Sequence, residues 1–297
     1  MTDAARPSRT YRPLLGVFFM CSACALFPVM NGLVKLLSEG YHSHQIVWAR
    51  TASHLLFVAL LFGPHMGMRL FRTRQFGAQF GRSIMLLTST FLFFSAIKFV
   101  PIASAAAVSF TAPLVVVLLA WPLLGERITL SRLLAVTTGF AGVMVVIRPG
   151  SDVFQWASVM ILGSATCYAI YQILTRRVAG LDDPATSVFY SALLGTIVMS
   201  FFAPFNWRTP DNWRDGLMLA SLGAFGGLGH YCVAKAMTYA SANFVAPFNY
   251  TQIIGSVIVG YLFFAEVPDL YTWIGAAIIV SAGLAVGWQG RRRAAAD

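Results

Sequence analysis

The strongest constraint on this chain is its series of long apolar stretches, separated by short segments that contain charges, proline or glycine. A helix that crosses a bilayer needs about 20 predominantly apolar residues, and ten stretches of that order fit along the 297 residues. These stretches leave no room for a separate soluble domain, so we expect an all-α integral membrane protein. We predict spans over residues 13–35, 44–63, 83–100, 103–124, 128–147, 153–174, 185–204, 216–237, 242–264 and 270–288.

The composition agrees with a membrane as the main environment. Hydrophobic residues make up 58% of the chain and charged residues 11%, against about 25% charged residues in soluble domains. The cysteines Cys21, Cys24, Cys167 and Cys232 all lie inside apolar stretches, which indicates packing residues rather than a disulfide framework or a zinc site. We expect no metal and no cofactor.

Basic residues collect in alternate loops, as they do on the cytoplasmic side of membrane proteins. With both termini in the cytoplasm, fifteen of the 21 basic residues fall on that side and five on the outer side. This bias explains the net charge of +10 without a nucleic-acid partner. We predict a multi-pass protein of a bacterial inner membrane. Four arginines fall in one predicted cytoplasmic loop, where they either contact anionic lipid headgroups or are ordinary loop residues: Arg69, Arg72, Arg74 and Arg82.

The span pattern of the second half repeats that of the first with a shift of 140 residues. The shift aligns residues 96–146 with residues 236–286 without a gap, and it pairs Glu126 with Glu266. Residues 1–149 and 150–297 each hold five predicted spans, so the second copy must enter the membrane from the opposite side. Secondary transporters often contain such inverted repeats and hold their ligand near the midplane between them.

Several local features recur at matching places of the two halves. An apolar helix ends in Gly125-Glu126 or Ala265-Glu266 and is followed by a glycine-rich span, and the first half also contains Asn31-Gly32-Leu33-Val34-Lys35 and Arg50. From residue 14 to residue 286 this order resembles the EamA-type members of the drug/metabolite transporter superfamily. Ala265 departs from the glycine that this family prefers.

The resemblance implies a basket of ten helices around a central cavity. Cargo in that family includes amino acids, purines, sugars, vitamins and drugs, so the resemblance indicates a transporter far better than it indicates a cargo. The first two spans look most like those of uptake carriers for riboflavin and S-adenosylmethionine.

A charge inside the bilayer is costly, so Arg50 in the second span needs an explanation. It either binds an anionic cargo, or it reaches the outer interface or backbone carbonyls in a structural role. His54 lies one helical turn further along the same face and is either a second binding group or a packing residue.

The sixth, eighth and ninth spans contain clusters of polar and aromatic residues. Amides and imidazoles donate and accept hydrogen bonds, and tyrosines stack, so these residues suit a flat polar heterocycle. Polar contacts between helices and an interfacial aromatic belt explain them equally well. The candidate substrate-binding residues are Asn31, Trp48, Arg50, Phe94, Tyr168, Tyr171, Gln172, His230, Tyr231, Asn249, Tyr250 and Gln252.

The sequence contains no G-K-S or G-K-T phosphate loop and no set of nucleophile, base or metal ligands. ATP hydrolysis and an intramembrane enzyme are therefore not supported. We expect a secondary transporter that moves a small organic metabolite by alternating access, with an aromatic or heterocyclic cargo such as riboflavin or a nucleoside-like compound. An amino-acid or drug exporter of the same fold is the alternative, and a channel is the alternative from another class. The direction of transport, its coupling and the oligomeric state stay open.

Overall fold

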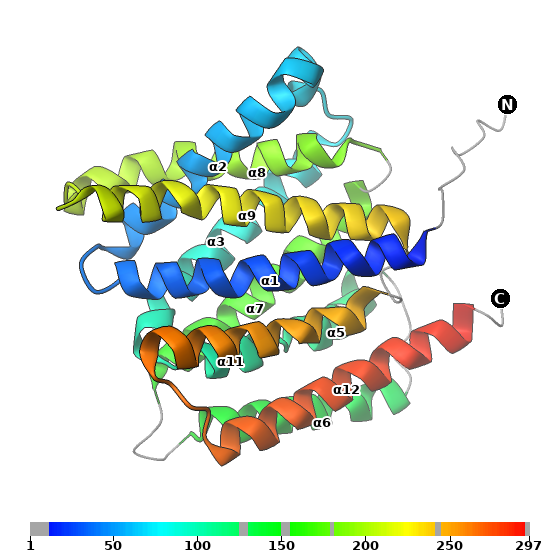
Figure 1. Ribbon diagram of the computed structural model, residues 1–297. Helices are drawn as coiled ribbons and strands as arrows, with labels where there is room; N and C mark the ends of the chain where they lie inside the picture. The colour runs from blue at the N-terminus through cyan, green and yellow to red at the C-terminus, as the bar shows by residue number, and fades with distance from the viewer. Residues whose placement is uncertain (1–11, 125–129, 150–154, 179–180, 241–244, 295–297) are drawn as a thin grey trace, which may run out of the picture.

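The computed structural model describes residues 12–124, 130–149, 155–178, 181–240 and 245–294. Within these ranges every regular element is a helix, and the long helices lie side by side (Figure 1). The α-helices are α1 (Pro13–Leu37), α2 (Ser43–Met66), α3 (Phe76–Ala96), α4 (Ile102–Ser109), α5 (Ala112–Leu124), α6 (Leu130–Ile147), α7 (Trp156–Val178), α8 (Pro184–Phe202), α9 (Trp213–Tyr239), α11 (Thr251–Phe264) and α12 (Leu270–Ala294). The 3-10 helices are η1 (Gly67–Phe71), η2 (Ile97–Phe99), η3 (Ala203–Asn206) and η4 (Ala246–Tyr250).

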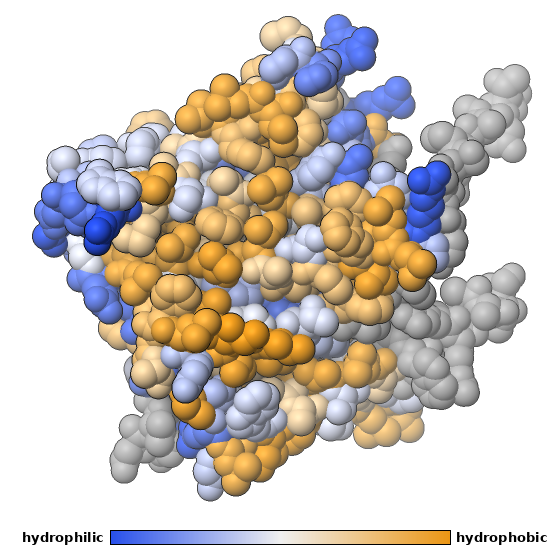
Figure 2. Space-filling view, in the orientation of Figure 1, coloured by the Kyte–Doolittle hydropathy of each residue, from blue (hydrophilic) through white to orange (hydrophobic). Residues whose placement is uncertain are grey.

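The outer surface of the bundle is apolar. In the described part of the chain, seven helical stretches are long and apolar enough to cross a membrane, and three further apolar helices are shorter. Large side chains such as Phe18, Leu60 and Phe201 are exposed on them. Figure 2 shows hydrophobic residues across the middle of the visible face and hydrophilic residues at its left end and upper right. Water disfavours an apolar surface of this extent, so this is a membrane protein whose helices lie in the bilayer.

Helices from the two halves of the chain pack against each other throughout the bundle. α1 packs against α9 and α11, α3 against α7, α6 against α12, and α2 against both α8 and α9. The contact between α6 and α12 is so close that a Cβ added at Gly142 would lie 2.9 Å from the carbonyl oxygen of Gly275. Small residues allow such approach, which is how apolar helices associate where lipid removes the hydrophobic driving force.

The fourth predicted span, 103–124, is two helices rather than one. α4 and α5 are separated by two residues, because Pro113 has no N–H to donate to the carbonyl of Ser109. In the ninth predicted span, the 3-10 helix η4 contains Pro247 and precedes α11. Both spans therefore contain a break with a proline beside it, and irregular backbone within a membrane occurs where protein or a cavity satisfies its polar groups.

The third predicted span begins too late. α3 starts at Phe76 rather than at residue 83, so Arg82 lies inside a helix and is 2% exposed. The prediction of a cytoplasmic loop at Arg82 was wrong, and neither contact with lipid headgroups nor an ordinary loop role applies to this residue. Hydropathy failed here because Gln79 and Arg82 are polar side chains that face other helices, and a hydropathy pattern assigns polar residues to the surface.

Candidate functional site

Arg50 of α2 is enclosed by protein, with 4% of its surface exposed. Its Nη2 atom lies 3.1 Å from Nε2 of His230 in α9. Its guanidinium carbon lies 5.9 Å from the centre of the Phe94 ring in α3. The side chain therefore joins three helices inside the bundle instead of reaching lipid or water.

Three glycines of α9 make room for the side chains of α2. A Cβ added at Gly226 would lie 3.3 Å from Nε of Arg50, and one added at Gly227 would lie 2.9 Å from Cδ2 of His54. A Cβ added at Gly223 would collide with the backbone of α2 itself. These glycines set the distance between α2 and α9, and with it the position of the polar side chains between them.

Three polar atoms at this contact are buried and have no hydrogen-bond partner among the described residues. They are Nε of Arg50, Nε2 of His54 and Nδ1 of His230. Buried polar groups are nearly always paired, and leaving one without a partner costs about 1–3 kcal/mol. Three such atoms gathered at one place mark a candidate site for a ligand.

Aromatic rings surround His230. Phe27 of α1 meets it edge to face with ring centres 5.2 Å apart, and Tyr171 of α7 does so at 6.2 Å. The ring of Tyr168 stacks on that of Tyr171 at 5.3 Å. Such rings offer flat apolar faces together with the tyrosine hydroxyls. We define the central cluster as Phe27, Arg50, His54, Phe94, Tyr168, Tyr171 and His230.

A second buried arginine, Arg82 of α3, adjoins the central cluster through Tyr171. Its Nη2 donates to the Tyr171 hydroxyl at 3.0 Å and its Nε to the Thr175 hydroxyl at 3.1 Å. Its Nη1 donates to the side-chain oxygen of Gln79 at 3.1 Å and to the carbonyl of Ser187 at 2.6 Å. Every nitrogen of this guanidinium is paired. Gln79, Arg82, Thr175 and Ser187 form what we call the Arg82 network.

The Arg82 network continues to a carboxylate in the connection between α7 and α8. Asp182 accepts hydrogen bonds from the Gln79 amide at 2.9 Å, the Thr73 hydroxyl at 2.5 Å and the backbone N–H of Arg74 at 3.0 Å. Burial by itself raises the pKa of Asp182, but these hydrogen bonds and the charge of Arg74 together lower the pKa below its ordinary value. They join this connection to the one between α2 and α3.

An ion pair lies at the end of the bundle where α1 ends and α12 begins (Figure 1). Lys35 of α1 pairs with Glu266, which follows α11. Lys35 also donates to the carbonyl of Val100 at 2.8 Å, and Glu266 accepts from the N–H of Ile102 at 2.9 Å. These four residues form the Lys35–Glu266 clasp. Glu126, the counterpart of Glu266 in the repeat, lies outside the described residues.

The structure brings five of the sequence candidates together in the central cluster and places three others elsewhere. Trp48 donates through Nε1 to a serine of α8 at 2.9 Å. Tyr231 packs on a phenylalanine of α2 with ring centres 5.1 Å apart. Tyr250 packs on Phe110 at 5.1 Å. These three side chains contribute to contacts between helices.

Four amide candidates have no direct polar link to the central cluster. Asn31 is buried in α1, and Gln172, Asn249 and Gln252 are half-buried in α7, η4 and α11. Among the described residues, no hydrogen bond joins any of these four side chains to the cluster.

Sequence reasoning missed Phe27 and the Arg82 network. Gln79 and Arg82 are three residues apart and share one face of α3, so a polar face on an otherwise apolar helix was the available signal. The predicted third span begins after Arg82 and therefore leaves this face out. Phe27 has no such signal, since one phenylalanine in an apolar helix looks like any other.

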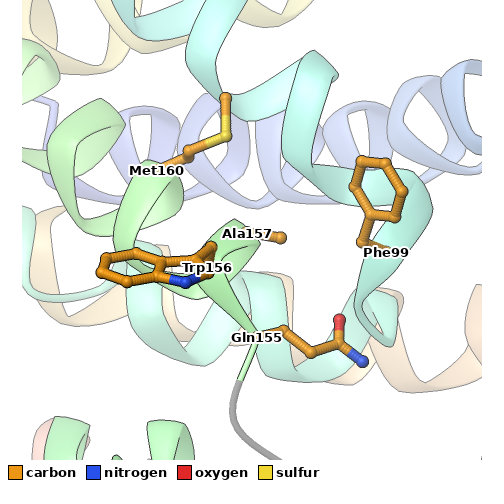
Figure 3. Close-up of a pocket in the computed structure, with 5 residues that line it drawn as sticks. All are labelled: Phe99, Gln155, Trp156, Ala157 and Met160. Carbon is orange, nitrogen blue, oxygen red and sulfur yellow. The ribbon is translucent and has the colours of Figure 1, made fainter.

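A separate cavity of about 420 Å³ lies at the start of α7. It is lined by Phe99, Gln155, Trp156, Ala157 and Met160, and Figure 3 shows Phe99 of η2 across from Trp156 and Met160. The helical rise puts about 18 Å between Trp156 and Tyr168, so this cavity is distinct from the central cluster. Its lining residues include no charged side chain. We therefore place the candidate site at the central cluster.

Comparison with known proteins identifies one family along nearly the whole chain. The model of the EamA-like transporter family matches residues 14–148 and 155–287. The chain is 30% identical to a riboflavin transporter of Vibrio cholerae, over 95% of this chain and 96% of that one. It is 27% identical to an S-adenosylmethionine uptake transporter of Rickettsia conorii, over 94% of this chain and 93% of that one.

A solved crystal structure has the same fold. It superposes with a TM-score of 0.62 at 20% identity and covers 97% of this chain and 99% of that chain.

A bundle of apolar helices that encloses ionisable and aromatic side chains is typical of membrane transport proteins. The chain belongs to the EamA-like transporter family. It is a transporter and not an enzyme, which confirms both the resemblance seen in the sequence and the class predicted from it.

Proposed function

We propose that this protein is a secondary transporter that moves a small organic metabolite across a bacterial inner membrane by alternating access, with both termini in the cytoplasm. The cargo is an aromatic or heterocyclic compound, and riboflavin is the first candidate. Relatives named as a riboflavin transporter and as an S-adenosylmethionine uptake transporter support this class of cargo.

The observation that carries the proposal is the central cluster. It combines an arginine–histidine pair, whose polar atoms are partly unpaired, with the rings of Phe27, Phe94, Tyr168 and Tyr171. A flat compound with polar edges matches such a site, because its faces stack on the rings and its edges take the hydrogen bonds.

The division into two inverted repeats, 1–149 and 150–297, is part of the proposal. Under the shift of 140 residues, the contact of α3 with α7 corresponds to that of α9 with α1, and the contact of α2 with α9 corresponds to that of α8 with α3. Phe110 and Tyr250 are equivalent positions and their rings touch, as residues on the two sides of a twofold axis do. The family model also matches once in each half.

Alternating access requires the cargo site to be closed toward one side at a time. The Lys35–Glu266 clasp ties α1, α4 and the end of α11 together at one end of the bundle. The hydrogen bonds of Asp182 tie two connections together at the other end. The motion is an exchange of conformations between the two repeats. Because a pseudo-twofold axis relates them, this exchange converts an opening on one side of the membrane into an opening on the other.

Counterflow in proteoliposomes tests the carrier mechanism. Purified protein is reconstituted into vesicles loaded with unlabelled riboflavin, and entry of labelled riboflavin is measured against vesicles without internal riboflavin and vesicles without protein. We expect saturable entry that internal riboflavin accelerates. A carrier with bound cargo changes from its inward-open to its outward-open state faster than an empty carrier does. Entry that neither saturates nor responds to internal riboflavin would identify a channel instead.

Variants test the position of the site. We expect His230→Ala to lower riboflavin counterflow about tenfold or more, since it removes a hydrogen-bonding group from the cargo site. The exposed His65 supplies the matched control, and His65→Ala should transport at the wild-type rate. Asn249→Ala and Gln252→Ala test the two amides outside the cluster. Wild-type flux in His230→Ala would rule out the assignment to the central cluster, and wild-type flux in all three variants would rule out the two amides as well.

A further inference from the structure

Building on the transport function proposed above, we propose that Arg50 and His230 select the cargo by its acceptor oxygens. The two residues bind a carboxylate or a pair of ring carbonyls, and Arg50 excludes compounds with a permanent positive charge. The inference names the class of cargo and the residues that discriminate it.

The contrast between the two buried arginines is the first step. Arg82 uses all of its nitrogens on four acceptors supplied by the protein. Arg50 is equally buried, yet its only hydrogen-bond contact in the described part of the chain is with His230, and its Nε has no partner. The hydrogen-bonding capacity of the Arg82 guanidinium is therefore used within the protein, whereas the Arg50 guanidinium has unused donors.

The pairing of Arg50 with His230 fixes the protonation of the histidine. A guanidinium only donates hydrogen bonds, so Nε2 of His230 is the acceptor from Nη2 of Arg50 at 3.1 Å. An imidazole whose Nε2 accepts is neutral and carries its proton on Nδ1. Nδ1 of His230 is buried without a partner among the described residues. The pair thus offers two unused N–H donors, which call for acceptor atoms on a ligand.

The charge of Arg50 is not balanced by a described carboxylate. The ion pairs of the described ranges join Lys35 to Glu266, Arg148 to Asp269 and Arg208 to Asp211. Charges interact more strongly inside a protein than in water because screening is weaker there. An uncompensated guanidinium therefore attracts an anionic or oxygen-rich group and repels a second cation.

The cargo that fits this arrangement is planar, carries a carboxylate or two ring carbonyls, and has no fixed positive charge. Its ring stacks beside Phe27 and Tyr171, which lie against His230. Its oxygens take the free N–H groups of Arg50 and His230. Riboflavin has two ring carbonyls and no net charge, whereas S-adenosylmethionine carries a sulfonium, so the cluster separates these two kinds of cargo.

Four probes in the counterflow assay test the selection. Riboflavin and uridine are uncharged and have a ring with two carbonyls, and S-adenosylmethionine and thiamine carry a permanent positive charge. We expect the wild-type protein to transport riboflavin, uridine or both. Its flux of either cation should be at least about tenfold lower than its flux of the transported carbonyl compound. Arg50→Gln should lower the flux of the carbonyl compounds about tenfold or more, and the exposed Lys98→Gln, which removes the same charge elsewhere, should not.

Arg50→Lys separates the charge from the hydrogen-bond geometry. Lysine keeps the positive charge and loses the planar fork, so this variant should still exclude the cations while transporting the carbonyl compounds more slowly. Faster wild-type flux of S-adenosylmethionine or thiamine than of both carbonyl compounds would overturn the inference, and so would carbonyl flux in Arg50→Gln within about twofold of wild type. These two results leave the transport function intact. Absence of flux for all four probes would instead reject the proposed heterocyclic cargo, and this inference with it.

Stability separates selection of cargo from a purely structural role. A buried charge without a counter-charge costs desolvation free energy that its removal relieves, whereas breaking a structural pair destabilises a protein. The Tm of Arg50→Gln in detergent should therefore equal or exceed the wild-type value. Loss of flux together with a Tm lowered by more than roughly 5 °C would assign Arg50 to the scaffold and overturn the inference.

Discussion

At the residue scale, two carboxylates, Glu266 and Asp182, lie at opposite ends of the bundle, and each accepts hydrogen bonds from several donors. Glu266 accepts hydrogen bonds from Lys35 and from a backbone N–H. Asp182 accepts from Thr73, Gln79 and a backbone N–H. Such donors replace the water that a charge loses on burial. The central cluster has the opposite character, since it contains arginine and histidine.

Asp182→Asn should make this difference measurable. The substitution leaves the shape of the side chain unchanged but weakens the three hydrogen bonds to it, and we expect the free energy of unfolding at pH 7 to fall by about 1 kcal/mol. The folded-state pKa of Asp182 lies below its unfolded value. Its contribution is therefore present above about pH 4 and is lost as the pH falls through the folded-state pKa.

Thermal unfolding in detergent at pH 7 and near pH 3 measures this effect. The Tm gap between wild type and Asp182→Asn should be smaller at the lower pH. Asp211→Asn is the control, because the pair of Arg208 and Asp211 is more than half exposed and contributes little. A gap of equal size at both pH values would show that the carboxylate charge has no part in it.

At the scale of the elements, the end of α11 determines where the Lys35–Glu266 clasp forms. Ala265 has a φ of +52°, and the N–H of Glu266 donates to the carbonyl of Gly260 at 3.0 Å. This is the glycine-type cap of a helix, made here with alanine. The left-handed turn reverses the chain at once and places Glu266 beside Lys35. Glycine would adopt this left-handed conformation at lower cost than alanine, since a Cβ makes it unfavourable.

The contact between α2 and α9 gives the sharpest prediction for an element. A Cβ at Gly223 would meet the backbone of Ser53 and His54, which cannot move aside as a side chain can. We expect Gly223→Ala to separate the two helices, to destabilise the protein by about 1–3 kcal/mol and to reduce transport. Tm and riboflavin counterflow would report the two effects.

Gly216 lies in the same helix and provides a matched control. A Cβ added there has no atom within 4 Å, so Gly216→Ala should leave transport unchanged and raise stability by up to about 1 kcal/mol through helix propensity. If both variants behave alike, the glycine contact does not set the spacing of α2 and α9.

At the scale of the whole molecule, a nearly symmetric pattern of helix contacts surrounds an asymmetric site. The repeat equivalents of Arg50 and His230 are Tyr190 and Thr90, so the second copy of the pair is missing. In the alternating access that we propose, the two repeats would open the molecule on either side, whereas the single candidate site between them would serve both states.

Labelling tests the proposed orientation of the whole molecule. In a background without the four native cysteines, we expect Glu39→Cys to react with a membrane-impermeant maleimide from outside intact cells. Arg74→Cys should react only in inside-out vesicles. Both positions are exposed and belong to connections at opposite ends of the bundle. Reaction of Arg74→Cys from outside, with Glu39→Cys protected, would reverse the orientation.

The sequence by itself determined the membrane class and the family, because these depend on local properties, and five of its twelve candidate residues lie in the central cluster. The length of an apolar stretch is a property of one helix alone. The charge of Arg50 within such a stretch can likewise be recognised without knowing which helices pack against it. Spacing also placed Tyr168 and Tyr171 on one face of one helix. The sequence did not determine that Arg82 is buried or that Phe27 lies beside His230, since both follow from contacts between distant helices.

Only the tertiary structure decided which polar groups meet. Arg50 and His230 are 180 residues apart, and they reach each other because the glycines of α9 allow α2 to approach closely. The same packing supplies Arg82 with acceptors from α7 and α8 and leaves Arg50 without them. Hydropathy shows that Arg50 lies within an apolar span, whereas the hydrogen bonds that its guanidinium leaves unused depend on which helices face it.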